Sequence, residues 1–210
     1  GGITATGATT EIEVTGLTNG TEYTFTVTAT NGVGESPESS ASSSVIPKGN
    51  QTITFDNPWD QDFGTELTLS ASASSGLTVT FTSETPEVCT VTSDGKVTFL
   101  KAGTATIKAS QAGNVEYLAA ESVTQSFTVN AVKPGAPTNV TATAGDGKAT
   151  VRFTAPAFNG GSAITGYTVK SYPGGITATG TTTEIEVTGL TNGTEYTFRV
   201  TATNGVCESL

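Results

Sequence analysis

The densest group of side chains that could bind a ligand is the segment 56–62, which reads DNPWDQD. Carboxylate and amide oxygens are the ligands that Ca²⁺ prefers, so Asp56, Asp60 and Asp62 form a candidate calcium site. The segment lacks the 12-residue ligand spacing of an EF-hand loop, and a plain loop at the pole of a domain is the competing interpretation. We expect no other cofactor.

Two further residues are candidates for contacts with a partner. Trp59, the only tryptophan, lies in the same segment, and an exposed tryptophan can stack on a sugar or anchor a protein. Capping the core of its own module is the alternative. Cys89 and Cys207 are 118 residues apart, and two such cysteines form no disulfide framework. Cys207 is therefore a candidate for contact between chains.

The sequence offers no recognisable catalytic machinery. It contains no histidine, which removes the commonest general base and the commonest metal ligand. The carboxylate pairs Glu11/Glu13 and Glu184/Glu186 alternate with Ile and Val residues, as expected for the solvent face of a strand rather than for a glycosidase pair. We expect that the protein is not an enzyme.

Charge and composition exclude several classes of partner. The net charge is −10, which argues against nucleic acid and anionic membranes, because both select for patches of Lys and Arg. No run approaches 18 consecutive apolar residues, so we expect no membrane span. The apolar fraction of 35% predicts small cores.

The sequence predicts that the chain forms β-strands, because apolar residues alternate with Thr or charged residues. In the segment 195–203, Tyr196, Phe198, Val200 and Ala202 share one face, which indicates a half-buried antiparallel strand. The same alternation occurs in the segments 140–143, 149–154 and 164–170. Gly-rich turn signals separate these segments, as is typical of an all-β sandwich.

Residues 135–210 resemble a fibronectin type III domain. The segments corresponding to strands A, B, C, C′, E and F are 137–140, 149–156, 164–172, 175–180, 184–190 and 195–204. The run 189–196 resembles the tyrosine corner of this family, which implies that the Tyr196 hydroxyl bonds to upstream backbone. Phe153 stands where the family usually has a tryptophan.

Residues 50–131 resemble a bacterial Ig-like domain found between fibronectin-like modules. The expected strands are 51–55, 66–73, 77–83, 88–92, 96–100, 104–110 and 122–130. The sequence 93–96, SDGK, predicts a two-residue hairpin turn. Relatives often pair a cysteine at the place of Cys89 with one at the place of Ala105, so the resemblance implies an inward-facing thiol without its partner.

Residues 1–37 recur as residues 174–210 at a constant offset of 173. Only four pairs differ: Ala8/Thr181, Thr26/Arg199, Gly34/Cys207 and Pro37/Leu210. Such near-identity is typical of tandem arrays. By the resemblance, residues 1–46 correspond to strands C′, E, F and G of a partial module. The sequence thus predicts tandem antiparallel β-sandwiches with a 173-residue two-module repeat. A Ser/Pro/Gly-rich linker at 39–50 and a short linker stiffened by proline at 130–137 would join the modules.

We therefore expect structural or adhesive repeat modules that form an extended stalk of a secreted or cell-surface, bacterial-like protein. Partners would be neighbouring modules or identical chains through exposed strand edges, or a cell-surface protein or glycan. One alternative is a filament subunit in which residues 1–46 of one molecule complete residues 135–172 of another. A second is an accessory carbohydrate-binding or spacer region of a secreted hydrolase, with Trp59 and Phe158 as sugar contacts.

Overall fold

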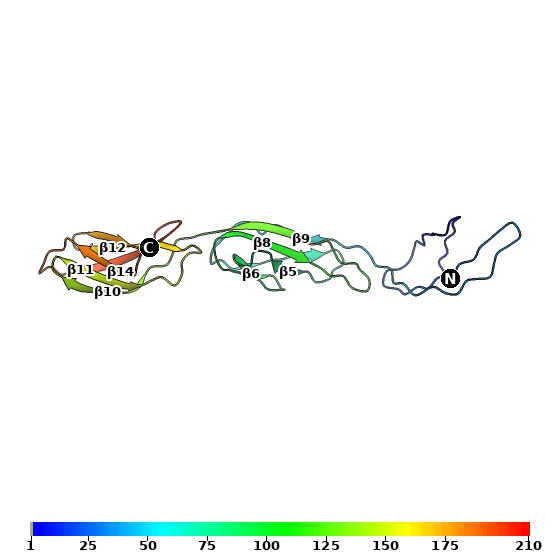
Figure 1. Ribbon diagram of the computed structural model, residues 1–210, viewed down its shortest axis with the longest axis horizontal. Helices are drawn as coiled ribbons and strands as arrows, with labels where there is room; N and C mark the ends of the chain where they lie inside the picture. The colour runs from blue at the N-terminus through cyan, green and yellow to red at the C-terminus, as the bar shows by residue number, and fades with distance from the viewer. Residues whose placement is uncertain (1) are drawn as a thin grey trace. The chain divides into compact units, whose positions relative to one another are not determined.

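The computed structural model describes residues 2–210, which form β-strands and irregular connections and no helix (Figure 1). Accordingly, none of these residues belongs to a helix that could cross a membrane. The chain divides into two compact units. The first comprises Gly1–Asp56, Ser70–Thr80 and Ala109–Thr124, and the second comprises Asn57–Leu69, Phe81–Lys108 and Gln125–Leu210.

Within the second unit, six antiparallel strands form a two-sheet sandwich near the C-terminus. One sheet has the order β10-β11-β14 and the other has the order β13-β12-β15. The bounds are Thr138–Gly145 (β10), Lys148–Thr154 (β11), Ile164–Tyr172 (β12), Thr177–Gly180 (β13), Glu184–Thr188 (β14) and Thr197–Asn204 (β15). All six expected strands are present, and the prediction of an all-β sandwich is confirmed.

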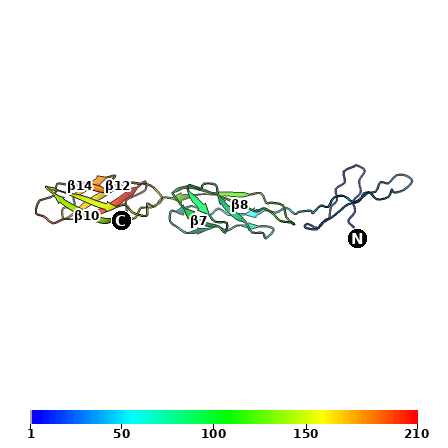
Figure 2. The ribbon, with the colours of Figure 1, turned by 60° about the horizontal axis from the view of Figure 1, so that its bottom comes forward.

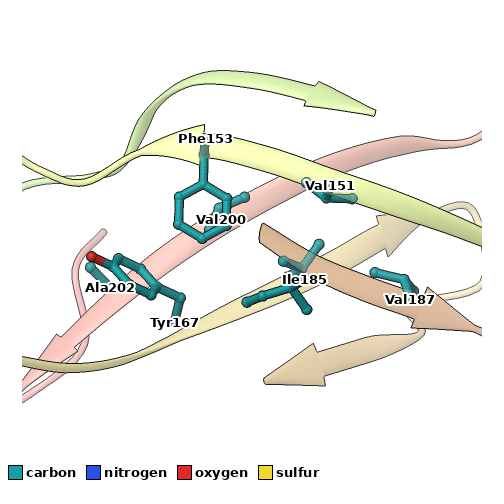
Figure 3. Close-up of a cluster of buried hydrophobic side chains, with 8 residues drawn as sticks. Val151, Phe153, Tyr167, Ile185, Val187, Val200 and Ala202 are labelled. Carbon is teal, nitrogen blue, oxygen red and sulfur yellow. The ribbon is translucent and has the colours of Figure 1, made fainter. Parts of the chain in front are cut away.

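The core of this sandwich consists of alternate residues from facing strands. Val151, Val169 and Val187 are fully buried, and Figure 3 shows the side chains of β11 and β14 directed toward those of β12 and β15. Each buried side chain of this size contributes about 1.5–3 kcal/mol. Phe153 fills the place of the family's tryptophan and packs edge-on against Tyr167, with ring centroids 4.8 Å apart. The alternation in the sequence therefore predicted this core correctly.

The tyrosine corner is also confirmed. The backbone N–H of Thr191 donates a hydrogen bond of 3.2 Å to the hydroxyl of Tyr196. The first copy contains the same bond, from the N–H of Thr18 to the hydroxyl of Tyr23, at 3.0 Å. The bond spans only five residues, so it forms in both copies regardless of their surroundings.

Strand β10 differs from the expected half-buried strand. Its alternating sequence predicts an inward face, yet all eight of its residues are exposed, and Val140 is 38% exposed. The strand pairs with β11 along one edge. β10 lies close to β15 in the other sheet, and among residues 2–210 only Glu208 and Ser209 pair with the outer edge of β15. The residue types alternate as expected, but burial does not, because little of the chain covers this face of β10.

Nine strands form the expected Ig-like region. They are Ile53–Thr54 (β1), Gln61–Asp62 (β2), Leu67–Thr68 (β3), Ser72–Ala73 (β4), Thr80–Ser83 (β5), Cys89–Val91 (β6), Lys96–Phe99 (β7), Gly103–Ser110 (β8) and Val123–Asn130 (β9). The sheets are β1-β4, β3-β7-β6 and β2-β9-β8-β5. The expected strand 66–73 is split into β3 and β4. Strand β2, which pairs in parallel with β9, was not expected from the sequence.

Two local expectations in this region have different outcomes. Cys89 and Ala105 are both fully buried, and Cys89 is a free thiol, as the resemblance implied. The two-residue turn at 93–96 is wrong, because Val91 pairs with Val97 and the N–H of Thr92 donates to the carbonyl of Lys96. The loop therefore has three residues, with Gly95 at a φ of 92°. A single left-handed glycine suits a three-residue loop, whereas a type I′ turn needs two positive φ angles.

The first copy of the repeat does not form the strands that its sequence predicts. Residues 2–49 contain only isolated bridges, such as Tyr23 with Val45, and Figures 1 and 2 draw this segment without strand arrows. Its side chains are exposed where the second copy buries them: Ile12 is 37% exposed and Ile185 is 5% exposed. In the second copy β11 and β12 supply pairing and cover. The described residues provide no equivalent of these two strands for the first copy.

Candidate functional site: a joint between two sandwiches

The segment 56–62 presents its tryptophan to solvent. Trp59 is 78% exposed and has a φ of 60°, a left-handed conformation that is uncommon for a non-glycine residue. The side-chain oxygen of Asn57 accepts a hydrogen bond of 2.8 Å from the Trp59 N–H and so supports this turn. Trp59 therefore does not cap a core, and its role in binding a partner remains a prediction.

The carboxylates of the same segment hold the loop to strand β9. Asp60 Oδ1 accepts a hydrogen bond of 2.7 Å from the backbone N–H of Thr128, and Asp62 Oδ1 accepts one of 3.3 Å from the side chain of Asn130. Within residues 2–210, no three acidic or cysteine side chains gather closely enough to hold a metal ion. The structure thus does not bring Asp56, Asp60 and Asp62 together, and calcium plays no part in the function proposed below.

The paired glutamates of the second copy have partners that the sequence did not reveal. Lys148 Nζ lies 2.6 Å from Glu186, and Arg152 Nε lies 2.8 Å from Glu184, across the β11–β14 pair. All four side chains are about half-exposed, so these ion pairs fix register more than they add stability. The interpretation of Glu184 and Glu186 as a solvent-facing stripe holds, and they form no paired-acid site.

The most organised polar cluster lies at the junction of the Ig-like region and the C-terminal sandwich, inside the second unit. We call it the joint. It comprises Phe63, Ala102, the linker 132–135, the loop 158–161 and Asn204. The backbone N–H of Ala102 donates a hydrogen bond of 2.8 Å to the carbonyl of Gly161. The rings of Phe63 and Phe158 pack with centroids 5.7 Å apart. The joint therefore has both a hydrogen bond and an apolar contact between the two sides.

The linker is held along its length by the loop 158–161. The N–H of Val132 donates to the carbonyl of Gly160 at 2.9 Å, and the N–H of Gly135 donates to the carbonyl of Phe158 at 2.8 Å. Buried Asn204 completes the arrangement, because its side-chain amide donates to the carbonyls of Val132 and Asn159 at 2.7 and 2.9 Å. A buried amide with both protons bonded holds its neighbours in one geometry.

Two glycines make this close approach possible. Gly160 and Gly161 have φ angles of 71° and 81°, which favour glycine. A Cβ on Gly160 would lie 1.9 Å from the carbonyl oxygen of Val132, and one on Gly161 would lie 2.5 Å from the ring of Phe63. Any other residue would push the two sides of the joint apart.

The joint was not predicted from the sequence, although some of its residues had been singled out there. The Asn159-Gly160-Gly161 run gave a turn signal, and Phe158 stood out as a loop aromatic. The signal that could have pointed to the joint is the glycine pair, since two successive glycines after an aromatic residue favour close backbone approach. The contact with Phe63 joins residues almost a hundred positions apart. No local pattern encodes such a contact.

The fold and the joint define a protein of tandem β-sandwiches. Comparison with known families agrees: residues 2–45 and 135–209 match the profile described as Fibronectin type III domain, and residues 77–131 match the one described as Bacterial Ig-like domain. The first match covers more than half of the chain, so the chain belongs to the fibronectin type III family. The resemblances noted in the sequence are thereby confirmed. Domains of these types are generally non-catalytic scaffolds.

Several solved structures are similar to the chain. "Titin kinase and its flanking domains" is 29% identical over 38% of this chain and 16% of that one, with a TM-score of 0.35. Domains d3–d4 of the rat CD45 extracellular region are 24% identical over 41% of this chain and 51% of that one, with a TM-score of 0.37. A two-domain fibronectin type III segment of chicken tenascin is 19% identical over 78% and 94%, also at 0.37. No curated protein matches the chain.

Proposed function

We propose that the chain is a non-catalytic structural segment of a secreted or cell-surface repeat protein, in which sandwich modules act as a spacer that bears load. The observation that carries this proposal is the joint. Its hydrogen bonds and the Phe63–Phe158 contact oppose bending between the Ig-like region and the C-terminal sandwich. A stalk that holds a binding domain away from a surface needs such stiffness.

Other features of the chain support the same function. Both domain types are typical of extracellular and surface proteins. The near-identical copies at a 173-residue offset allow the length of an array to change by duplication of a unit. The strands present Thr, Ser and charged residues outward and reserve apolar residues for the cores. None of these features requires a bound ligand.

Backbone ¹⁵N relaxation tests the stiffness of the joint. The full chain should give one rotational correlation time for amides of β6–β8 and of β11–β15, because the two sides tumble together. Phe63→Ala removes one ring of the joint and should make the two correlation times differ. Trp59→Ala is the matched control, since that ring is exposed and lies outside the joint. Independent tumbling of the two sides in the unmodified chain would rule out a stiff spacer.

A second candidate function is self-association into a filament. Apolar side chains of the first copy favour it: Val27 is 60% exposed, whereas its counterpart Val200 is 7% exposed. The second copy shows which strands cover such residues, namely the equivalents of β11 and β12. In a second molecule those strands already pair with its own β14 and β15, so association would bury the exposed face by an exchange of equivalent strands between molecules. Molecular mass across a concentration series tests this candidate.

A further inference from the structure

Two positively charged side chains lie opposite each other on the outer face of the C-terminal sandwich. Lys170 on β12 is the register partner of Arg199 on β15, and both residues are exposed. They face away from the core, because the neighbouring residues Val169 and Val200 are buried. Like charges directly opposite each other destabilise an antiparallel pair of strands. Departures of this kind from the local rules of folding are expected at functional sites.

The described residues provide no acidic partner for this pair. The two cations on β11 each lie beside a glutamate of β14, whereas neither Lys170 nor Arg199 forms an ion pair within residues 2–210. Two glutamates flank β15 in the sequence, Glu195 and Glu208. Glu208 accepts a hydrogen bond from the hydroxyl of Thr201, and neither glutamate pairs with the two cations. The pair therefore keeps its positive charge.

The ring of Tyr172 holds both cations in place. Lys170 Nζ and Arg199 Cζ each lie 5.5 Å from the centroid of this ring, which is within the range of cation–π attraction. Tyr172 follows Lys170 by two residues on β12, so it shares the outer face, where it is 42% exposed. The ring carries no charge and so does not neutralise the cations. The two positive groups are thus preorganised for a negatively charged ligand.

Threonine side chains surround the cations on the same face. Thr177 on β13 is the register partner of Lys170, and Thr179 is the register partner of Thr168. Strand β12 is paired along both edges, by β13 and by β15, so an extended peptide cannot add to it as a further strand. The face therefore offers side chains only: positive groups that bind carboxylates, and hydroxyls that both donate and accept hydrogen bonds.

We propose that the outer face of the β13-β12-β15 sheet, around Lys170, Tyr172 and Arg199, is a binding site for an acidic polysaccharide whose sugars carry carboxylates. The guanidinium of Arg199 would hold one carboxylate through two parallel N–H bonds, and Lys170 would add a second positive charge. The charge distribution supports this ligand. Residues 132–210 contain five Lys or Arg and five Asp or Glu, so the net charge of −10 resides in residues 1–131. This inference goes beyond the spacer function, because it assigns a ligand to one module.

The repeat itself supplies the variant that tests the site. Thr26 stands where the second copy has Arg199, one of only four differences in 37 pairs. Binding of the full chain to polygalacturonate at low ionic strength is the measurement. Arg199→Thr should weaken binding at least about tenfold. The midpoint of denaturant unfolding should not fall, since the substitution removes a like-charge pair. Arg152→Thr is the matched control: it makes the same charge change on the opposite sheet and should alter binding by less than about twofold.

Polyglutamate and neutral dextran separate recognition of an acidic sugar from attraction between charges. We expect weaker binding of polyglutamate, which carries carboxylates without sugar hydroxyls, and no binding of dextran. Equal losses in Arg199→Thr and Arg152→Thr would show that only net charge matters and would overturn the site. Equal affinity for polyglutamate would overturn the polysaccharide as its ligand. A chain that does not bind polygalacturonate would overturn the whole proposal, and the spacer function would stand in each case.

Discussion

At the scale of single residues, the repeat provides its own controls, because identical side chains occupy two different settings. Tyr196 and Tyr23 accept the same backbone hydrogen bond, from Thr191 and Thr18, yet only Tyr196 belongs to a copy with a buried core. A difference between equivalent substitutions therefore reports on the setting and not on the residue. This design allows each local interaction to be separated from its contribution to the stability of a module.

Tyr196→Phe should lower the free energy of unfolding of the C-terminal sandwich. The substitution removes the acceptor of the Thr191 N–H and leaves the rest of the ring in place. Denaturant unfolding followed by amide signals of β11 and β12 measures the change. Tyr23→Phe removes the same bond from the first copy and should leave that unfolding curve unchanged. Equal effects of the two substitutions would contradict the assignment.

The tyrosine corner also predicts a pH dependence. The backbone hydrogen bond from Thr191, followed by its side chain, lowers the pKa of Tyr196 below the ordinary value of 10.0. The unfolded state therefore binds more protons between the lowered pKa and the ordinary one. The pH-dependent part of the Tyr196 contribution to stability should rise with pH through this window and be absent below it, where only the hydrogen bond of the neutral hydroxyl remains. Ultraviolet titration of the folded chain, with Tyr196→Phe as reference, checks the order, and a pKa above the ordinary value would contradict it.

At the scale of elements, the fate of a strand depends on the neighbours that it finds. Val27 and Val200 have the same local sequence apart from Thr26 and Arg199, and only Val200 is buried between two sheets. β14 and β15 form because β11 and β12 pair with them. Periodicity specifies which face is apolar, and the partner strand determines whether that face becomes a core.

Matched valine deletions test this dependence. Val200→Ala should destabilise the C-terminal sandwich by about 2 kcal/mol, since it removes two buried methyl groups and leaves a cavity. Val27→Ala should change the stability of the chain by less than about 0.5 kcal/mol, as is usual for an exposed position. Chemical denaturation of both variants gives the comparison. A cost at Val27 as large as that at Val200 would show that the first copy has a core of its own.

The sequence predicted most of the fold and little of the joint. The alternation in 164–170 predicted a strand there, and the resemblance to the family placed strand C at 164–172, the bounds of β12. The tyrosine corner and the place of Phe153 also followed from the family pattern. The three-residue loop at Gly95 depended on register, which the local sequence did not reveal.

The joint could not be predicted from local sequence patterns, because it depends on contacts between residues that are far apart in the sequence. The Asn204 side chain donates a hydrogen bond to the linker 72 residues before it, and the Phe63 ring packs against Phe158 of the other sandwich.

At the scale of the whole molecule, we propose that the modules carry load through a stiff joint. The parts of the chain have different mechanical roles. The C-terminal sandwich has a buried core and long strand pairs, and the Ig-like region has a buried core, so both should resist extension. Residues 2–46 have isolated bridges and exposed apolar side chains, so they should extend at low force.

Stretching single full-length chains by their two ends tests this central claim most directly. The account predicts two abrupt unfolding events, from the Ig-like region and from the C-terminal sandwich. Each event should lengthen the chain by about 25 nm, as expected for some 80 residues at 3.3–3.6 Å each. Residues 2–46 should lengthen smoothly before either event. Smooth extension of the entire chain would show that its modules bear no load and would contradict the proposed function.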